Sequence, residues 1–341
     1  MAGMQRRHVL WLVVSIVLLS ACASVSPQAP EAEPVTVRVA VMQSLSHAPV
    51  FIADEEGYFA EEKLDVKFVF LRRSSEALAA VAQGEVDVVL GSLYPGHLNA
   101  IARGGNIKFV ADKGHYDPEG CAFGALVVGN ALIDAGVLQD STLLEGCSVG
   151  ANAASFSGYL LTHALAIAGM DLDDVLVENP PAAAKYDATC DGTLDASLSF
   201  EPWLTRMLDE GEAAIWLTVQ EAVPEFQHGV LTYGPVLLEE NTDAGERFMV
   251  AYLKAVRQYN LGKTPRNVEI LSKRLEWDAD ELGKMCWLPF RDNGQIDVQS
   301  VLDFQAWALE LGLLDEALEV DEFWDARFVE HANQVLGTPS G

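Results

Sequence analysis

Basic side chains are scarce in this chain of 341 residues. Lysine and arginine together number 22 against 50 aspartates and glutamates, which gives a formal net charge of −28. Proteins that bind nucleic acid neutralise its phosphates with lysine and arginine. We therefore expect no nucleic-acid partner. The surplus of carboxylates instead keeps the chain soluble and can attract it to a basic partner surface.

Sequence motifs of enzyme active sites are missing as well. The chain has no glycine-rich phosphate loop, no G-x-S-x-G elbow and no H-E-x-x-H zinc motif, and the run Gly150–Gly158 lacks the elbow spacing. Its five cysteines fall outside any C-x-x-C or Cys/His metal spacing. The sequence therefore predicts no enzyme activity, no metal site and no cofactor.

The amino terminus has the pattern of an export signal. Arg6 and Arg7 precede the apolar run Val9–Leu19, which is too short to span a bilayer. The run ends in Leu19-Ser20-Ala21-Cys22, which resembles a bacterial lipobox. We expect residues 1–21 to be a lipoprotein signal peptide, Cys22 to carry the lipid, and residues 22–34 to be a flexible tether. An ordinary signal peptide with an incidental cysteine is the alternative.

Export would take four further cysteines, Cys121, Cys147, Cys190 and Cys286, into an oxidising compartment. One or two disulfides are compatible with that setting, and so are buried free thiols. The spacing does not assign a pairing.

Strand-like and helix-like segments alternate from Val37 onward. The first unit passes from a buried strand at Val37–Met42, through a helix that begins near Pro49 and ends at Gly57, to a strand at Asp65–Leu71. Such alternation predicts parallel sheets with helices on both faces. We expect two α/β lobes joined by hinge strands: lobe 1 from residues 35–121 plus 237–337, including a helical C-terminal tail, and lobe 2 from residues 122–236.

Several runs of residues carry a family resemblance. They are His47-Ala48-Pro49 with Ala53–Ala60 (ADEEGYFA) and Leu64-Asp65-Val66, then Gln83–Val88 (QGEVDV), then Leu144–Gly150 (LEGCSVG). In this order they resemble the nitrate/sulfonate/taurine and thiamine-precursor family of periplasmic-type binding proteins, although Cys147 replaces the usual lysine. The resemblance covers residues 35–240. It implies a bilobed periplasmic-binding-protein (type II) fold.

The resemblance also implies a function and a location. Its members include substrate-binding subunits of ABC importers, so we expect a lipid-anchored protein on the extracytoplasmic face of the cell membrane that docks on permease subunits. The family also contains fungal enzymes that make the thiamine pyrimidine and carry a compact cysteine-rich run. Here the cysteines are scattered, so this enzymatic alternative is not supported.

By the same resemblance, the ligand meets loops at the carboxyl ends of strands in both lobes. The predicted ligand-binding residues of lobe 1 are Gln43, Ser44, Ser46, His47, Ser92, Leu93, Tyr94, His115 and Tyr116. Those of lobe 2 are Asn152, Ser155, Phe156, Phe200, Glu201 and Trp203. The aromatic members can face a flat ring, and the polar members can bond ring edges or hydroxyls.

The charge of these loops bears on the kind of ligand. They contain no arginine and one lysine, Lys113, whereas a sulfonate or nitrate site normally offers a guanidinium or a bare helix N-terminus. Glu201 disfavours an anion further, although a helix starting at Ser155 could still hold one. We therefore expect an uncharged or weakly basic heteroaromatic ligand, and the number of aromatic side chains favours riboflavin. The thiamine pyrimidine precursor and an alkylsulfonate or nitrate stay open as alternatives.

Each candidate residue also has a purely structural explanation. Tyr116, Phe156 and Phe200 can be core residues at the ends of elements, and His47 can cap a helix. Glu201-Pro202-Trp203 can form a turn whose tryptophan packs on the next helix.

Overall fold

The structure is a computed structural model that describes residues 33–71 and 74–337. The predicted signal peptide, Cys22 and nearly all of the tether lie outside the described residues. Within the described residues, no helix is both long and apolar enough to cross a membrane.

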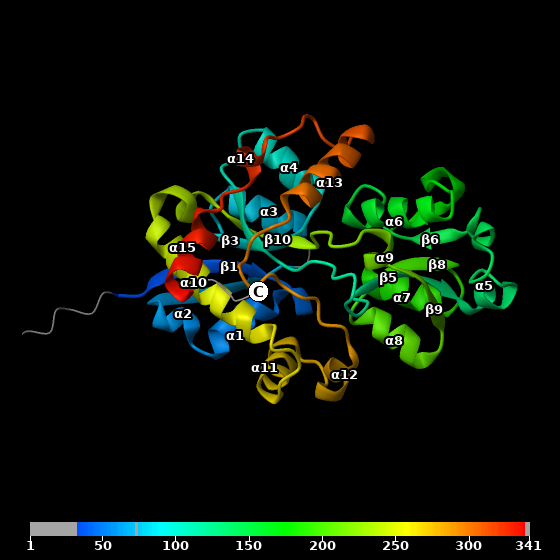
Figure 1. The fold of residues 1–341 in the computed structure, drawn as a ribbon, viewed down its shortest axis with the longest axis horizontal. Coiled ribbons are helices and arrows are strands. Elements are labelled where there is room, and N and C mark those ends of the chain that lie inside the picture. The colour runs from blue at the N-terminus through cyan, green and yellow to red at the C-terminus, as the bar shows by residue number, and fades with distance from the viewer. Residues whose placement is uncertain (1–32, 72–73, 338–341) are drawn as a thin grey trace, which may run out of the picture. The chain divides into compact units, whose positions relative to one another are not determined.

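Among the described residues, two five-stranded sheets form the centres of two lobes, and Figure 1 shows helices flanking both. The lobe 1 sheet has the order β2-β1-β3-β10-β4, with bounds β1 Val35–Val41, β2 Leu64–Phe70, β3 Val88–Ser92, β4 Lys108–Asp112 and β10 Gly229–Tyr233. The lobe 2 sheet has the order β7-β6-β8-β5-β9, with bounds β5 Gly124–Gly129, β6 Ser148–Gly150, β7 Leu176–Glu178, β8 Ala196–Phe200 and β9 Ala213–Thr218. In both sheets the strand that arrives from the other lobe, β10 or β5, is inserted next to the last strand of the order.

The prediction of parallel sheets is wrong for one strand in each lobe. β10 runs antiparallel to β3 and β4, and β5 runs antiparallel to β8 and β9. Both are the first strands that the chain forms after it crosses from the other lobe. The crossings lie at the carboxyl edge of the parallel strands, so the chain enters each new sheet from that edge and must run the opposite way.

β10 does not extend through the whole run from His228 to Leu237, although that run has the composition of a strand. It ends at Tyr233, and Pro235 leads into the helical turn η4 at Val236–Glu240. The sequence places residues 122–236 in lobe 2, but the ladder of β10 with β3 puts this strand in lobe 1. The boundary on this side therefore lies before Gly229.

The first β-α-β unit forms as its sequence predicts. Val37 and the run Val39–Val41 of β1 are buried, as expected for a strand inside a sheet that helices cover. A short turn, η1 (Leu45–His47), leads into α1 (Ala48–Glu55), which has Pro49 in its first turn. Gly57 then takes a left-handed conformation (φ 76°) and ends the helix.

The remaining helices complete the two lobes and the tail. Lobe 1 has α2 Tyr58–Glu61, α3 Ser74–Ala82 and α4 Pro95–Ala102. Lobe 2 has α5 Asn130–Ala135, η2 Ser141–Leu144, α6 Phe156–Ile167, η3 Leu172–Asp174, α7 Ala182–Cys190, α8 Trp203–Glu210 and α9 Val219–Ala222. The tail has α10 Thr242–Tyr259, α11 Pro265–Leu275, α12 Ala279–Lys284, α13 Val298–Glu310, α14 Val320–Phe323 and α15 Arg327–Leu336.

The tail packs on lobe 1, as expected, and also contacts lobe 2. α10 lies against α1, α2 and α15 (Figure 1). At lobe 2, α12 pairs with α8 through Arg206–Glu281 and Lys284–Asp209 (2.6 Å for the second). α13 reaches α6, where the indole of Trp307 donates to the Thr162 hydroxyl (3.3 Å).

The two segments that cross between the lobes form a short antiparallel ribbon. They are residues 113–123 and 223–228, and they meet at a bridge between His115 and Gln227. The backbone amide of Tyr116 donates to Phe226 O (3.1 Å), and that of His228 donates to Gly114 O (2.9 Å).

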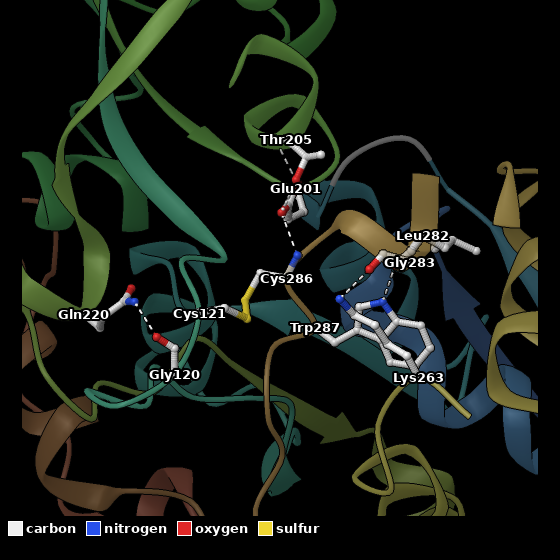
Figure 2. Close-up of a disulfide and its surroundings, with 10 residues drawn as sticks. All are labelled: Gly120, Cys121, Glu201, Thr205, Gln220, Lys263, Leu282, Gly283, Cys286 and Trp287. Carbon is white, nitrogen blue, oxygen red and sulfur yellow. Dashed lines mark hydrogen bonds between the residues drawn. A yellow bond between two sulfur atoms is a disulfide. The ribbon is translucent and has the colours of Figure 1, made fainter. Parts of the chain in front are cut away.

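A disulfide links this ribbon to the tail (Figure 2). It joins Cys121, at the end of the first crossing segment, to Cys286, just after α12. Beside it, a carboxylate oxygen of Glu201 accepts a hydrogen bond from the Cys286 backbone amide (2.8 Å). Cys147 and Cys190 are free thiols. The structure thus supplies the pairing that the spacing leaves open.

Candidate functional site

The carboxyl ends of β3 and β6 open onto one cavity of about 360 Å³. Lobe 1 lines it with the segment between β3 and α4, and lobe 2 lines it with the segment between β6 and α6. The lining residues are Ser92, Leu93, Tyr94, Asn152, Ala154, Ser155, Phe156 and Ser157. The cavity therefore lies where strand ends in α/β sheets usually present ligand-binding loops.

Two helices begin at this cavity, one from each lobe. α4 starts directly after Tyr94, and α6 starts directly after Ser155. The Ser155 hydroxyl caps α6 by accepting from the Ser157 backbone amide (3.2 Å), and the Ser157 hydroxyl accepts from the Asn152 amide (3.0 Å). Helix N-termini carry partial positive charge. At α6 the amides of Ser157 and Gly158 already bond to Ser155, and at α4 Pro95 has no N–H, so the charge of the helix ends counts for more here than free donors. The arrangement can stabilise a negative or strongly hydrogen-bond-accepting group.

Tyr94 is the aromatic residue of lobe 1 at the cavity. Its ring lies 4.3 Å from the His97 ring and covers Gly96, where an added Cβ would lie 2.3 Å from the Tyr94 ring. The Tyr94 hydroxyl is buried and has no hydrogen-bond partner among the described residues. Burial lowers the pKa of His97 to about 4, so this imidazole is neutral at physiological pH. Tyr94 thus brings an aromatic ring to the site, while its buried hydroxyl is closed off from solvent.

Six of the predicted ligand-binding residues lie together in the cavity lining. They are Ser92, Leu93, Tyr94, Asn152, Ser155 and Phe156. Ala154 and Ser157 also line it and were missed. Ser157 could have been predicted from the sequence, because it lies in the first turn of the helix that Ser155 caps. The first turn of that helix lies beside the same cavity as its cap.

The predicted loop Gln43–His47 lies at the same sheet edge but does not line the cavity. Gln43 is exposed, whereas Ser46 and His47 are buried. The His47 ring bonds to Leu90 O (3.2 Å) and makes no side-chain cap for α1, so the capping explanation is wrong. Ser44 and Ser46 share a hydrogen bond between their hydroxyls (3.0 Å).

Tyr116 and Phe200 belong to an aromatic cluster where the lobes meet. The Tyr116 ring stacks near Phe156 (6.3 Å between centroids), Phe156 packs on Phe200 and Phe226, and the Tyr116 hydroxyl bonds to His228 Nδ1 (2.8 Å). Burial lowers the pKa of His228 well below its usual value, so the ring is neutral. Phe156 is the member of this cluster that also lines the cavity. Tyr116 is buried among its neighbours.

Glu201, Trp203 and His115 lie away from the cavity lining. Glu201 is buried and borders a second cavity of about 190 Å³ beside the disulfide. Its carboxylate also accepts from the Thr205 hydroxyl (2.7 Å), and burial raises its pKa despite these bonds. Trp203 packs on Tyr186 (5.2 Å) and under the Arg206 guanidinium. His115 lies in the crossing ribbon.

One cation at this sheet edge was noted in the sequence but not predicted as a site residue. Lys113 follows β4, is 1% exposed, and donates from Nζ to the Ser46 hydroxyl (2.8 Å). Its position directly after a strand, in loops otherwise lacking cations, was the signal. Within residues 33–71 and 74–337, no group of three or more His, Cys, Asp or Glu side chains is arranged to hold a metal ion.

Comparisons with known proteins agree with this fold. The nitrate-binding protein NrtA from Synechocystis PCC 6803 is 16% identical, with 90% of each chain covered and a TM-score of 0.74. The alkanesulfonate-binding protein SsuA from Xanthomonas axonopodis pv. citri, bound to MOPS, is 15% identical, with 87% of this chain and 100% of that chain covered and a TM-score of 0.67. DSZB in complex with biphenyl-2-sulfinic acid is 13% identical, with 88% and 99% covered and a TM-score of 0.64. At these identities the likeness shows the fold, which is the bilobed periplasmic-binding-protein fold expected from the sequence.

A search of curated protein sequences found no match. The family model described as NMT1/THI5 like matches residues 44–260, well over half of the chain and nearly all of the segment that carries the motif resemblance. The chain belongs to the NMT1/THI5-like family.

Proposed function

We propose that this protein is the solute-binding component of an ABC importer, which captures a small molecule between its two lobes and delivers it to a membrane permease. The observation that carries the proposal is the cavity itself, because residues of both lobes line it at the carboxyl edges of their sheets. Only a molecule bound between the lobes contacts both sets of residues. The nitrate- and alkanesulfonate-binding proteins of the same fold support this role.

An organic anion is the ligand class that the cavity favours. α4 and α6 both direct N-termini at it, and none of the eight described lining residues is acidic. Glu201 counted against an anion in the sequence, but its carboxylate borders the other cavity. MOPS and biphenyl-2-sulfinic acid, the molecules bound to two proteins of this fold, both carry an acidic sulfur group on a ring compound.

Riboflavin, the ligand favoured by the sequence, is the second candidate. Tyr94 and Phe156 bring aromatic rings to the cavity, and the hydroxyls of Ser92, Ser155 and Ser157 can bond a polyhydroxyl chain. Fewer aromatic faces are free than the sequence suggests, because Tyr116 and Trp203 pack against other residues. The thiamine pyrimidine precursor is smaller and uses the same groups.

The role is binding without turnover, on the outer side of the cell membrane. A lipid on Cys22 would tether the lobes there. A binding component must also leave its ligand unchanged, which separates this role from that of a pyrimidine-forming enzyme.

Calorimetric titration tests the proposal. Riboflavin, hydroxymethylpyrimidine, an alkanesulfonate and nitrate are each titrated into the protein, and the recovered ligand is analysed by mass spectrometry. We expect one of them to bind one-to-one at micromolar concentration or below and to be recovered intact. Conversion of the ligand, or no binding by any of the four, would count against the proposed role or its ligand range.

A further inference from the structure

Lys113 extends along the carboxyl edge of the lobe 1 sheet. Its backbone amide donates to Gly229 O (3.0 Å), and Gly229 pairs directly with Ser92 in the β10–β3 ladder. Its Nζ donates to the hydroxyl of Ser46, which follows β1 on the far side of β3. The end of β3 therefore lies between the backbone of Lys113 and its hydrogen-bond partner. Because Ser92 and Leu93 line the cavity, the Lys113 side chain passes beneath its lobe 1 floor.

This buried ammonium has no carboxylate of its own. The adjacent Asp112 is engaged elsewhere: it accepts from the Arg291 backbone amide (2.8 Å) and from the Gln227 side chain (2.5 Å), and it pairs with the Arg291 guanidinium (3.3 Å). Among the described residues, Lys113 forms no salt bridge, and Ser46 uses one of its three N–H donors. A buried charge without a partner is costly.

The other titratable groups around Lys113 do not balance its charge. The imidazoles of His47 and His228 are fully buried, and burial together with the positive charge of Lys113 holds their pKa values well below the usual range. Both rings are therefore neutral. Burial also lowers the pKa of Lys113 to about 7, although Asp112 opposes the shift. An anion bound in the cavity above Lys113 would supply the missing counter-charge and favour the protonated amine.

We propose that the Lys113 ammonium, held beneath the cavity floor by the Ser46 hydroxyl, supplies the positive charge that selects an acidic group on the ligand. The ligand itself lies in the cavity between Ser92–Tyr94 and Asn152–Ser157, and the buried pair of Lys113 and Ser46 is the charge subsite beneath it. The ligand is then an organic acid, such as a sulfonate, carboxylate or phosphate, carried on an apolar or ring-containing body. This inference rests on the proposed binding function and narrows its ligand class. Neutral riboflavin is then a weaker candidate ligand than a phosphorylated or sulfonated compound.

Matched pairs of neutral and anionic probes test the subsite. Hexanesulfonate is compared with hexanol, and riboflavin phosphate with riboflavin, by calorimetry on the full-length wild type and on Lys113→Met. In at least one pair, wild type binds the anion at least tenfold more tightly than the neutral partner, and Lys113→Met loses that advantage. Lys108→Met is the control, because Lys108 starts the same strand at its other end and donates to Asp321 O; it keeps the preference.

The pH profile gives a further readout. The affinity of the anionic probe falls as the pH rises through about 7 in wild type, because the free ammonium loses its proton there. His47 and His228 stay neutral across this range, and Asp112 stays paired with Arg291. A preference for the anion that survives in Lys113→Met, or equal binding of both members of each pair to wild type, overturns the subsite.

Thermal unfolding without any probe separates this inference from the wider proposal. If the buried ammonium of Lys113 destabilises the fold and is kept because it binds ligand, removing it should not lower stability. Lys113→Met then unfolds at a temperature equal to or above that of wild type at mildly acidic pH. A clear fall in the unfolding temperature makes Lys113 a structural residue and overturns the subsite. Failure of every probe to bind wild type would instead count against the proposed ligand range, and the unfolding comparison would still decide the status of Lys113.

Discussion

Lys113 couples protonation to folding as well as to ligand choice. Its pKa is about 7 in the folded protein, whereas a lysine in an unfolded chain titrates near pH 10.4. Between these two values the unfolded chain binds a proton that the folded chain does not, so the free energy of unfolding rises with pH. Below pH 7 both states hold the proton and the slope from Lys113 disappears.

We predict that wild type gains stability relative to Lys113→Met by about 1.4 kcal/mol per pH unit from about pH 7 to about pH 10. Urea denaturation of both proteins at a series of pH values measures the difference, and comparing the two cancels the titration of groups that they share. Parallel pH profiles for the two proteins would show that Lys113 is not desolvated in solution.

Tyr94 and Trp203 distinguish a cavity residue from an aromatic residue that packs elsewhere. Tyr94 lines the cavity, whereas Trp203 packs against Tyr186 at a tilt and beneath the Arg206 guanidinium. We predict that Tyr94→Ala weakens binding of the ligand about tenfold, the loss expected for one stacked ring. Trp203→Ala leaves the affinity within about twofold, and calorimetry measures both. Equal losses in the two variants would contradict this assignment of the rings.

At the residue scale, the sequence predicts where a residue lies along a strand or helix better than it predicts which groups its side chain contacts. Ser92 ends β3, Asn152 lies just beyond β6, and Tyr94 and Ser155 directly precede helices. The strand-and-helix pattern, together with the family resemblance, predicts their place at the cavity. Pattern does not show what a side chain touches after the lobes pack. Glu201 follows β8 as predicted, yet its carboxylate bonds to the Cys286 amide from the distant tail. The charge argument assumed that Glu201 faces the ligand, whereas its carboxylate borders the other cavity.

At the element scale, the disulfide fixes the tail to the crossing ribbon. It joins residues separated by 165 positions. Cross-linking across so long a loop restricts the unfolded chain by roughly 5 kcal/mol in the chain-entropy treatment, and measured effects are commonly smaller.

We predict that the double variant Cys121→Ser, Cys286→Ser loses about 3–5 kcal/mol of unfolding free energy. The single variant Cys147→Ser, which removes a free thiol, stays within about 0.5 kcal/mol of wild type. Guanidinium denaturation under oxidising conditions measures all three proteins. Adding a reductant to wild type should lower its free energy of unfolding by a similar amount, because it breaks the same disulfide. Equal stability of wild type and double variant would contradict the prediction.

Helices and strands themselves were largely predictable, and their exceptions have physical causes. Glycines such as Gly57 and Gly84 take left-handed conformations that end helices, so the boundaries they mark were found. The directions of β5 and β10 were not found, because a strand has the same period in either direction and the local sequence carries no sign of its orientation. α5 was missed because none of its residues is buried, which leaves no apolar stripe to detect.

At the scale of the whole molecule, the net charge of −28 bears on docking. Exposed carboxylates attract a basic permease surface over distances that salt shortens. We predict that uptake driven by this protein in reconstituted vesicles falls as sodium chloride is raised from low to physiological concentration, while ligand affinity measured in parallel changes less. Uptake that is independent of salt would mean that apolar contacts dominate docking.

The bilobed plan was predictable because two alternating sets are separated by long crossings. The disulfide pairing was not, since Cys121 and Cys286 meet only after the tail has returned past lobe 1 to contact α8.

That disulfide also changes the connectivity of the chain. All five strands of the lobe 2 sheet lie between Cys121 and Cys286, so lobe 2 is enclosed in a covalent ring whose closure lies beside the crossing ribbon. A single peptide-bond break anywhere in lobe 2 opens the ring without dividing the molecule. Lobe 2 is thus a lobe that a single cut cannot release.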